Sequence, residues 1–163
     1  LVTADSIEFT EKYDFSPVVD FLELEPHHGI VGFSLDNKTI WMFNIDIAPG
    51  KHFVFSPATD VRLYKGDRYI CCDMVSNFFI AKTDCLLANP WDNRLKLLEH
   101  EDFFYQLKAQ GRYSVFYTNA INARHHSVSD PQYQKYRDRA LHEFRDMVIE
   151  KYGFKEGYIK DRW

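Results

Sequence analysis

The sequence predicts an α+β fold in one domain spanning residues 1–163, with a mainly antiparallel sheet of about six strands, a long C-terminal helix and one or two shorter helices. Short runs of β-forming residues alternate with turn residues over the first half of the chain. Apolar residues at helical spacing dominate its last part. With 163 residues and a hydrophobic content of 45%, the chain can build one core without disulfide or metal support.

Two hairpins organise the predicted strands. Asp36 and Asn37 separate two β-rich runs and both tolerate positive φ, so they predict a tight hairpin. Lys65, Gly66 and Asp67 predict the turn of a second hairpin. The predicted strands, of which the last is expected to be an inner strand, are residues 29–35, 38–47, 52–55, 61–64, 68–75, 77–82 and 113–120.

The long C-terminal helix is the most clearly marked element. Asp130 is a favourable N-cap, Pro131 suits the first helical turn and Gly153 suits the C-terminal stop. Apolar residues between them recur every three or four positions, which predicts one face packed against the sheet. That face consists of Tyr136, Ala140, Phe144 and Val148.

Two shorter helices are predicted earlier in the chain. Residues 18–24 follow a Ser16–Pro17 pair that suits the start of a helix. Residues 101–110 predict a second helix, which Gly111 terminates. Residues 83–91 predict a loop.

The cysteines indicate a reducing environment. Three cysteines cannot all pair within one chain, and the adjacent Cys71 and Cys72 point to opposite faces of a strand. We therefore expect a cytoplasmic location, another reducing compartment or the interior of a virion. No secretory pattern and no membrane span is expected, and a first residue of Leu1 suggests a longer native chain.

The net charge of -4 disfavours a general nucleic-acid binder, although a single-stranded ligand stacked on aromatic residues stays open as a third alternative. No phosphate-binding loop, zinc-deaminase motif or nucleophile elbow occurs. No family resemblance is recognised from these residues.

One short segment suggests catalysis. Arg124, His125 and His126 are expected in a loop between the last strand and the long helix, near the anion-attracting N-terminus of that helix. A histidine can transfer protons near neutral pH, and an arginine can hold phosphate. The alternative interpretation is a polar surface loop with helix-capping residues.

Carboxylates on the sheet suggest a metal site that would assist such an enzyme. Asp46 and Asp73 on neighbouring strands could bind a divalent cation, and a solvent-facing sheet end is the alternative interpretation. His27 and His28 could also bind a metal, but the favoured interpretation is that they are solvated loop histidines. Cys72 is expected in the core rather than as a nucleophile.

The aromatic content of 17% supports a different function. Tyrosine, tryptophan and arginine are preferred anchors of protein interfaces. Trp91 in a loop and Tyr158 and Trp163 near the terminus are the predicted binding residues, and Tyr133 and Tyr136 are further candidates. An aromatic core with ordinary exposed rings is the alternative interpretation.

The leading functional hypothesis is a protein-binding or assembly component, with another protein or a second copy of the chain as partner. The alternative is a small hydrolase or nuclease that acts on a phosphate-containing substrate through Arg124, His125 and His126. The cofactor is unknown from the sequence, and a divalent metal is implied only by the alternative. Whether the protein is an enzyme stays open at this point.

Overall fold

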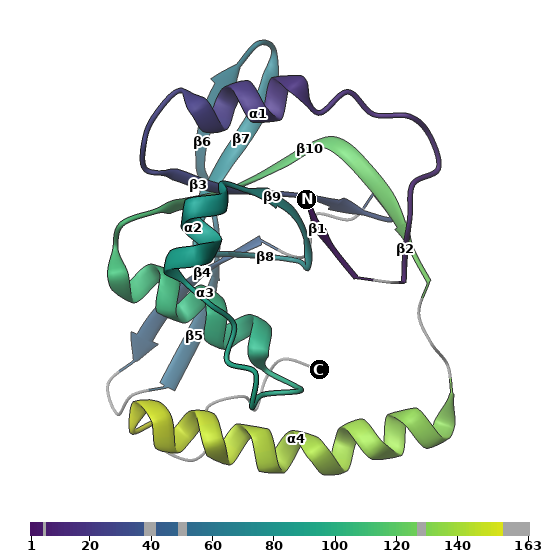
Figure 1. Ribbon diagram of the computed structural model, residues 1–163, viewed down its shortest axis with the longest axis vertical. Coiled ribbons are helices and arrows are strands. Elements are labelled where there is room, and N and C mark those ends of the chain that lie inside the picture. The colour runs from purple at the N-terminus through teal and green to yellow at the C-terminus, as the bar shows by residue number, and fades with distance from the viewer. Residues whose placement is uncertain (5, 38–41, 49–51, 127–129, 155–163) are drawn as a thin grey trace.

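The structure is a computed structural model that describes residues 1–4, 6–37, 42–48, 52–126 and 130–154. It confirms the α+β fold. Within the described residues, a main sheet of seven strands and a second sheet of three strands are accompanied by four helices (Figure 1).

The main sheet is mixed rather than purely antiparallel. Its two central strands run parallel to each other, and its remaining neighbours pair antiparallel. Along the sheet the order is β1 (Val2–Thr3), β9 (Phe78–Ala81), β3 (His28–Leu35), β10 (Ser114–His125), β7 (Asp67–Cys72) and β6 (Asp60–Tyr64), and β2 (Ile7–Glu8) pairs with the far end of β10.

The parallel pair at the centre is not predicted by the hairpin pattern. β3 and β10 are far apart in the sequence, and parallel neighbours need a long crossover connection. Here that connection contains the second sheet and two helices. The predicted inner strand at 113–120 is confirmed in position, but β10 continues to His125.

The prediction of a hairpin at Asp36 and Asn37 is wrong, because the strands on either side of this turn do not pair with each other. β4 (Met42–Ala48) pairs with β5 (His52–Pro57) and β8 (Met74–Val75) in the second sheet, whereas β3 stays in the main sheet. Both turn residues do adopt left-handed conformations, with φ of 53° and 56°. Their backbone N–H groups donate to Ala123 O and Asn122 Oδ1 of β10, so the turn is anchored to the parallel neighbour.

The second hairpin is confirmed. β6 and β7 pair antiparallel from Asp60 to Cys71. Lys65 and Gly66 form the turn with φ of 50° and 91°, which the glycine adopts without strain. β6 is the outer strand on this side of the main sheet among the described residues.

Helix α1 (Ser16–Glu23) covers one face of the main sheet (Figure 1). Its buried Val18, Phe21 and Leu22 belong to an aromatic-rich cluster. The Phe21 ring stacks on Tyr69 with centroids 3.8 Å apart. The helix predicted at 18–24 is therefore confirmed, with its start at the Ser16–Pro17 pair.

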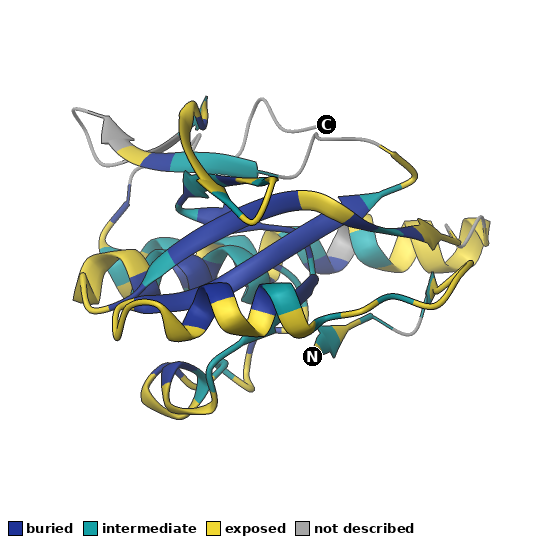
Figure 2. Cartoon of the chain, turned by 90° about the horizontal axis from the view of Figure 1, so that it is seen from above, coloured by how far each residue is buried: buried dark blue, intermediate teal, exposed yellow. Residues whose placement is uncertain are grey.

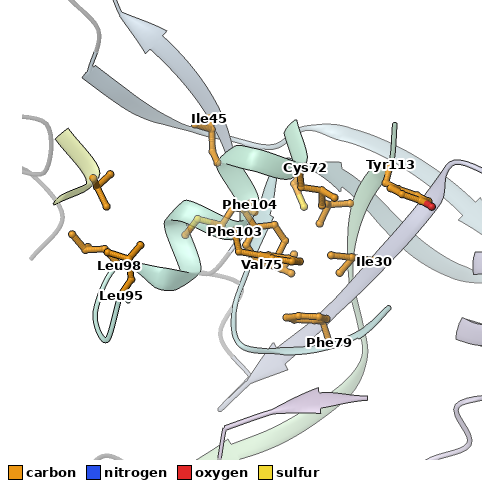
Figure 3. Packing of buried hydrophobic residues seen from close by; sticks show 14 of the residues in the cluster. Ile30, Ile45, Cys72, Val75, Phe79, Leu95, Leu98, Phe103, Phe104 and Tyr113 are labelled. Carbon is orange, nitrogen blue, oxygen red and sulfur yellow. The ribbon is translucent and has the colours of Figure 1, made fainter. Parts of the chain in front are cut away.

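The second core cluster involves α2 (Thr83–Ala88) and α3 (Glu99–Gln110) and includes Phe103 and Phe104, as Figure 3 shows. The prediction of a loop at residues 83–91 is wrong for Thr83–Ala88, which form α2. Burial of Cys85 and the hydrogen bond from Asn89 Nδ2 to Cys85 O stabilise this short helix. The helix predicted at 101–110 is confirmed, and Gly111 ends it with φ of 63°.

Helix α4 (Pro131–Tyr152) follows its sequence signals at both ends. Asp130 caps it by accepting a hydrogen bond from Gln132 N at 2.8 Å, and Gly153 ends it with φ of 64°. One side of its second half is buried, and Ala140, Phe144 and Val148 join the second core cluster.

Two parts of the prediction for α4 are wrong. The tyrosine expected on its buried face, Tyr136, is 49% exposed. The helix contacts α3 and the loop before it (Figure 1), whereas the sequence predicted packing against the sheet. Tyr105 of α3 contacts the Tyr152 ring with centroids 4.5 Å apart.

A buried carboxylate joins these two helices. Asp102 of α3 is completely buried and accepts hydrogen bonds from Tyr152 Oη at 2.5 Å and Gln106 Nε2 at 2.7 Å. Lys151 Nζ lies 2.9 Å from Asp102 Oδ1 and also donates to Asp92 Oδ2 at 3.0 Å. The network satisfies a charge that would otherwise be costly to bury.

All three cysteines are free thiols. Cys72 is buried in the core, as expected, and burial raises the pKa of its thiol well above the usual value. Such a thiol is a poor nucleophile. Among the described helices, none combines the length and apolar character that crossing a membrane requires.

Candidate functional site

The segment Arg124–His126 lies on a strand rather than in a loop. β10 extends through His125 and pairs with β2, so that Arg124 faces Glu8 across the ladder. Side chains alternate along a strand, which places Arg124 and His126 on one side and His125 on the other. The sequence missed this extension because residues 119–121 interrupt the pairing with β3, where the register shifts between Thr118 and Asn122.

Glu8 binds the two side chains that share its side of the strand pair. Its Oε2 lies 2.8 Å from His126 Nε2 and 3.7 Å from Arg124 Nη1. The hydrogen bond from His126, followed by the charges of His126 and Arg124, lowers the pKa of the Glu8 carboxyl. A carboxylate that orients a histidine is suited to proton transfer. The pair is exposed, however, and His125 contributes only its backbone N–H, which donates to Asp36 Oδ1 at 3.1 Å.

A polar hollow of about 300 Å³ lies beside Arg124. Asn122 is held in place there, because its Oδ1 accepts from Asn37 N at 2.7 Å and its backbone O accepts from Tyr13 Oη. We call it the Arg124 hollow, and it is lined by Thr10, Asp36, Asn37, Asn122, Ala123 and Arg124.

The two carboxylates predicted to bind a metal lie near β4 but have different partners. Asp73 Oδ2 accepts hydrogen bonds from Ile45 N at 2.8 Å and from Lys108 Nζ at 2.5 Å. Asp46 is exposed, and its nearest hydrogen-bond partner is Ser56 Oγ at 3.4 Å. No cluster of three or more His, Cys, Asp or Glu side chains suited to a metal occurs in the described parts of the chain. The metal site stays a prediction.

His28 is a core residue rather than a solvated loop histidine. It is 1% exposed, stacks on Phe21 with centroids 4.6 Å apart, and its Nδ1 donates to Phe21 O at 2.8 Å. Arg62 Nη1 lies 3.2 Å from His28 Nε2 and can donate to it. Burial, as the main cause, lowers the pKa of this imidazole. The ring is therefore held as a neutral structural group.

Trp91 lines a second, less polar hollow. Its ring stacks on Phe103 with centroids 4.2 Å apart, which fixes its orientation on α3. The adjoining hollow measures about 200 Å³, and we call it the Trp91 hollow. It is lined by Val2, Thr3, Ala4, Asn77, Trp91 and Glu99.

Two polar residues of the Trp91 hollow were not singled out by the sequence. Asn77 Oδ1 is buried and has no hydrogen-bond partner within the described part of the chain. Burial raises the pKa of the Glu99 carboxyl, while the nearby Arg137 guanidinium acts in the opposite direction. No sequence pattern could have marked them, because strand, loop and helix meet here only through the tertiary fold.

The first turns of α4 adjoin this region through Arg137. The Arg137 guanidinium lies over the Tyr133 ring, 5.9 Å from its centroid. Tyr133 and Tyr136 are 44% and 49% exposed, and a separation of three residues puts them on one side of the helix. We call Tyr133, Tyr136 and Arg137 the α4 patch. Figure 2 shows the exposed first turns of α4 at one end of the molecule.

The remaining predicted binding residues, Tyr158 and Trp163, lie outside the described residues. Comparisons of the chain with protein-family models, curated proteins and solved structures find no match. Function is therefore inferred from the side chains and their surroundings.

Proposed function

We propose that this domain is a protein-binding component of a larger assembly, and that the α4 patch is part of its binding surface. The observation that carries the proposal is the exposure of every residue from Pro131 to Tyr136 at the start of a 22-residue helix. Short helical segments gain most of their stability from packing, and this one has an aromatic side but no buried residue.

The chemistry of the α4 patch supports a protein partner. Tyrosine and arginine are enriched among the residues that contribute most to protein interfaces. The cation–π contact between Arg137 and Tyr133 orders both side chains before binding, which reduces the entropy lost when a partner docks. The alternative enzyme has less support, because His125 extends away from the side that Arg124 and His126 share.

Selection of peptides from a displayed random library on the immobilised domain tests the proposal. We expect the enriched peptides to lose at least about tenfold in affinity when Tyr133 and Tyr136 are both replaced by Ala, which corresponds to about 1.4 kcal/mol. Leu87→Ala is the matched control, because this side chain is 78% exposed on α2. Sedimentation equilibrium on the same three proteins shows whether the partner is a second copy.

Two results would contradict the proposal. One is the enrichment of no peptide together with a monomer at every concentration. The other is enriched peptides whose affinity is unchanged by the double α4 variant. Circular dichroism of the variants separates lost binding from lost folding.

A further inference from the structure

The Trp91 hollow has a size that decides which ligand it suits. At about 200 Å³ it is smaller than the roughly 300–1,000 Å³ typical of metabolite and cofactor sites. A single side chain from a partner is the ligand class of matching size. The hollow also adjoins the α4 patch, since Arg137 contacts Tyr133 and influences Glu99.

The polar lining of the Trp91 hollow contains one carboxylate, Glu99, beside the donor groups of Thr3 and Trp91 and the side-chain amide of Asn77. Glu99 forms no salt bridge with another described residue, and Asn77 Oδ1 is buried without a described hydrogen-bond donor. Arg137, whose charge acts to lower the pKa of Glu99, lies over the Tyr133 ring. The Glu99 carboxylate is partly buried and accepts a hydrogen bond from its own backbone N–H. A ligand that brings N–H donors and positive charge would stabilise its ionised form.

The apolar walls indicate what should carry that charge. Val2, Ala4 and Trp91 line the hollow beside the two acceptors. A lysine side chain combines an aliphatic stem, which packs on apolar surface, with a terminal ammonium group that donates three hydrogen bonds. Ammonium groups are also attracted to the tryptophan ring.

We propose that the Trp91 hollow accepts a lysine side chain of a partner protein, with its stem along Val2 and Trp91 and its ammonium group beside Glu99. The inference deepens the proposed function and rests on it for the protein source of the lysine. The acceptor chemistry of the hollow is independent of that source.

The test uses N-acetyl-lysine N-methylamide as the probe, with the norleucine analogue as a neutral control of similar length. Binding is followed by NMR through the indole N–H signal of Trp91, which the variant Trp91→Phe assigns. We expect saturable shifts with the lysine probe and none with norleucine. Glu99→Gln should weaken binding at least about tenfold, because it removes a charge-assisted hydrogen bond.

Two controls sharpen the assignment. Glu8→Gln removes the carboxylate that pairs with Arg124 and His126 and should leave the lysine affinity unchanged. Affinity should also fall as the pH is lowered from about 7 toward about 5, because burial raises the pKa of Glu99 and a protonated carboxyl attracts the ammonium group less. Equal shifts with lysine and norleucine, or equal affinities of wild type and Glu99→Gln, would overturn the inference.

The source of the cation is settled by a second probe. 1,5-Diaminopentane carries the same ammonium chain as lysine without the peptide groups. If it binds at least about tenfold more tightly than the lysine probe, the ligand of the hollow is a free amine, and the proposed protein source is overturned. Peptides that bind the α4 patch while the lysine probe does not bind would refute this inference alone. A bound lysine probe with no α4-dependent peptide would instead contradict the proposed function.

Discussion

The two halves of α4 are built on the same spacing of apolar residues but have different surroundings. In the second half, Ala140, Phe144 and Val148 are buried against the core that includes α3. In the first half, Tyr133 and Tyr136 continue the pattern toward the N-terminus but remain about half exposed. The helix has one side suited to burial along its length, and only part of that side meets the rest of the described domain.

The difference shows that an amphipathic pattern determines which side of a helix can be buried, but not what lies opposite. Leu95 and Leu98, in the loop before α3, lie close to the buried half in Figure 3. The first turns extend past this loop (Figure 1). A second distinction is chemical. The buried apolar side chains of the second half are Ala140, Phe144 and Val148, whereas the first half carries Tyr133 and Tyr136, whose hydroxyl groups tolerate water.

The largest expected effect comes from the buried half. Phe144→Ala should lower the free energy of unfolding by about 3–5 kcal/mol, because it removes a side chain that is only 7% exposed and leaves a cavity. Urea titration measures the change. A loss below about 1 kcal/mol would show that this ring is not packed in the core.

The polar network of the same half comes next. Lys151→Met should cost about 2 kcal/mol, because the fully buried Asp102 loses a charged donor but keeps Tyr152 and Gln106. Urea titration of Lys151→Met beside Lys135→Met, a lysine on the exposed first half, checks this. Equal stabilities of the two variants would contradict the prediction that Lys151 stabilises the fold through Asp102.

The pH dependence of stability should also arise from the buried half. Hydrogen bonds from Arg94, and then from Lys151, lower the pKa of Asp92 in the folded state. The carboxylate therefore stabilises the fold fully above its unfolded pKa of about 3.9 and loses this contribution as the pH falls through the folded pKa. The free energy of unfolding of Asp92→Asn should be lower than that of wild type at about pH 7, and the difference between the two proteins should decrease below about pH 4. A stability difference that increases in acid would contradict the lowered pKa of Asp92.

The start of the free half should respond more weakly. Asp130→Ala removes the side-chain acceptor for Gln132 N and should cost about 1 kcal/mol or less, since fraying of exposed turns limits the loss. Asp130→Asn keeps an acceptor and serves as the control. Thermal unfolding of both variants by circular dichroism gives the comparison, and a larger loss for Asn than for Ala would be incompatible with a cap.

The smallest effect is expected for the α4 patch. Tyr136→Ala should change the free energy of unfolding by less than about 0.5 kcal/mol, because the side chain is half exposed and is not part of the core. Urea titration alongside Phe144→Ala makes the contrast within one helix. A loss comparable with that of Phe144→Ala would mean that the first half also packs in the isolated domain.

The sequence alone determined the features that depend on neighbours along the chain. Asp130 and Gly153 mark the ends of α4 because a cap and a left-handed stop involve residues only a few positions away. Lys65 and Gly66 mark the β6–β7 turn for the same reason. Asp36 and Asn37 illustrate the limit: their φ values were anticipated, but the partner of the preceding strand was not.

The tertiary structure decided which elements pair and which side chains converge. The parallel pairing of β3 with β10 joins segments separated by most of the domain, and no local pattern encodes that choice. The Trp91 hollow likewise assembles a strand, a loop and a helix, so Trp91 was predicted while Asn77 and Glu99 were not. Local conformation is set by sterics and hydrogen bonds within a few residues, whereas a site depends on the distances between remote segments, which only the packed core fixes.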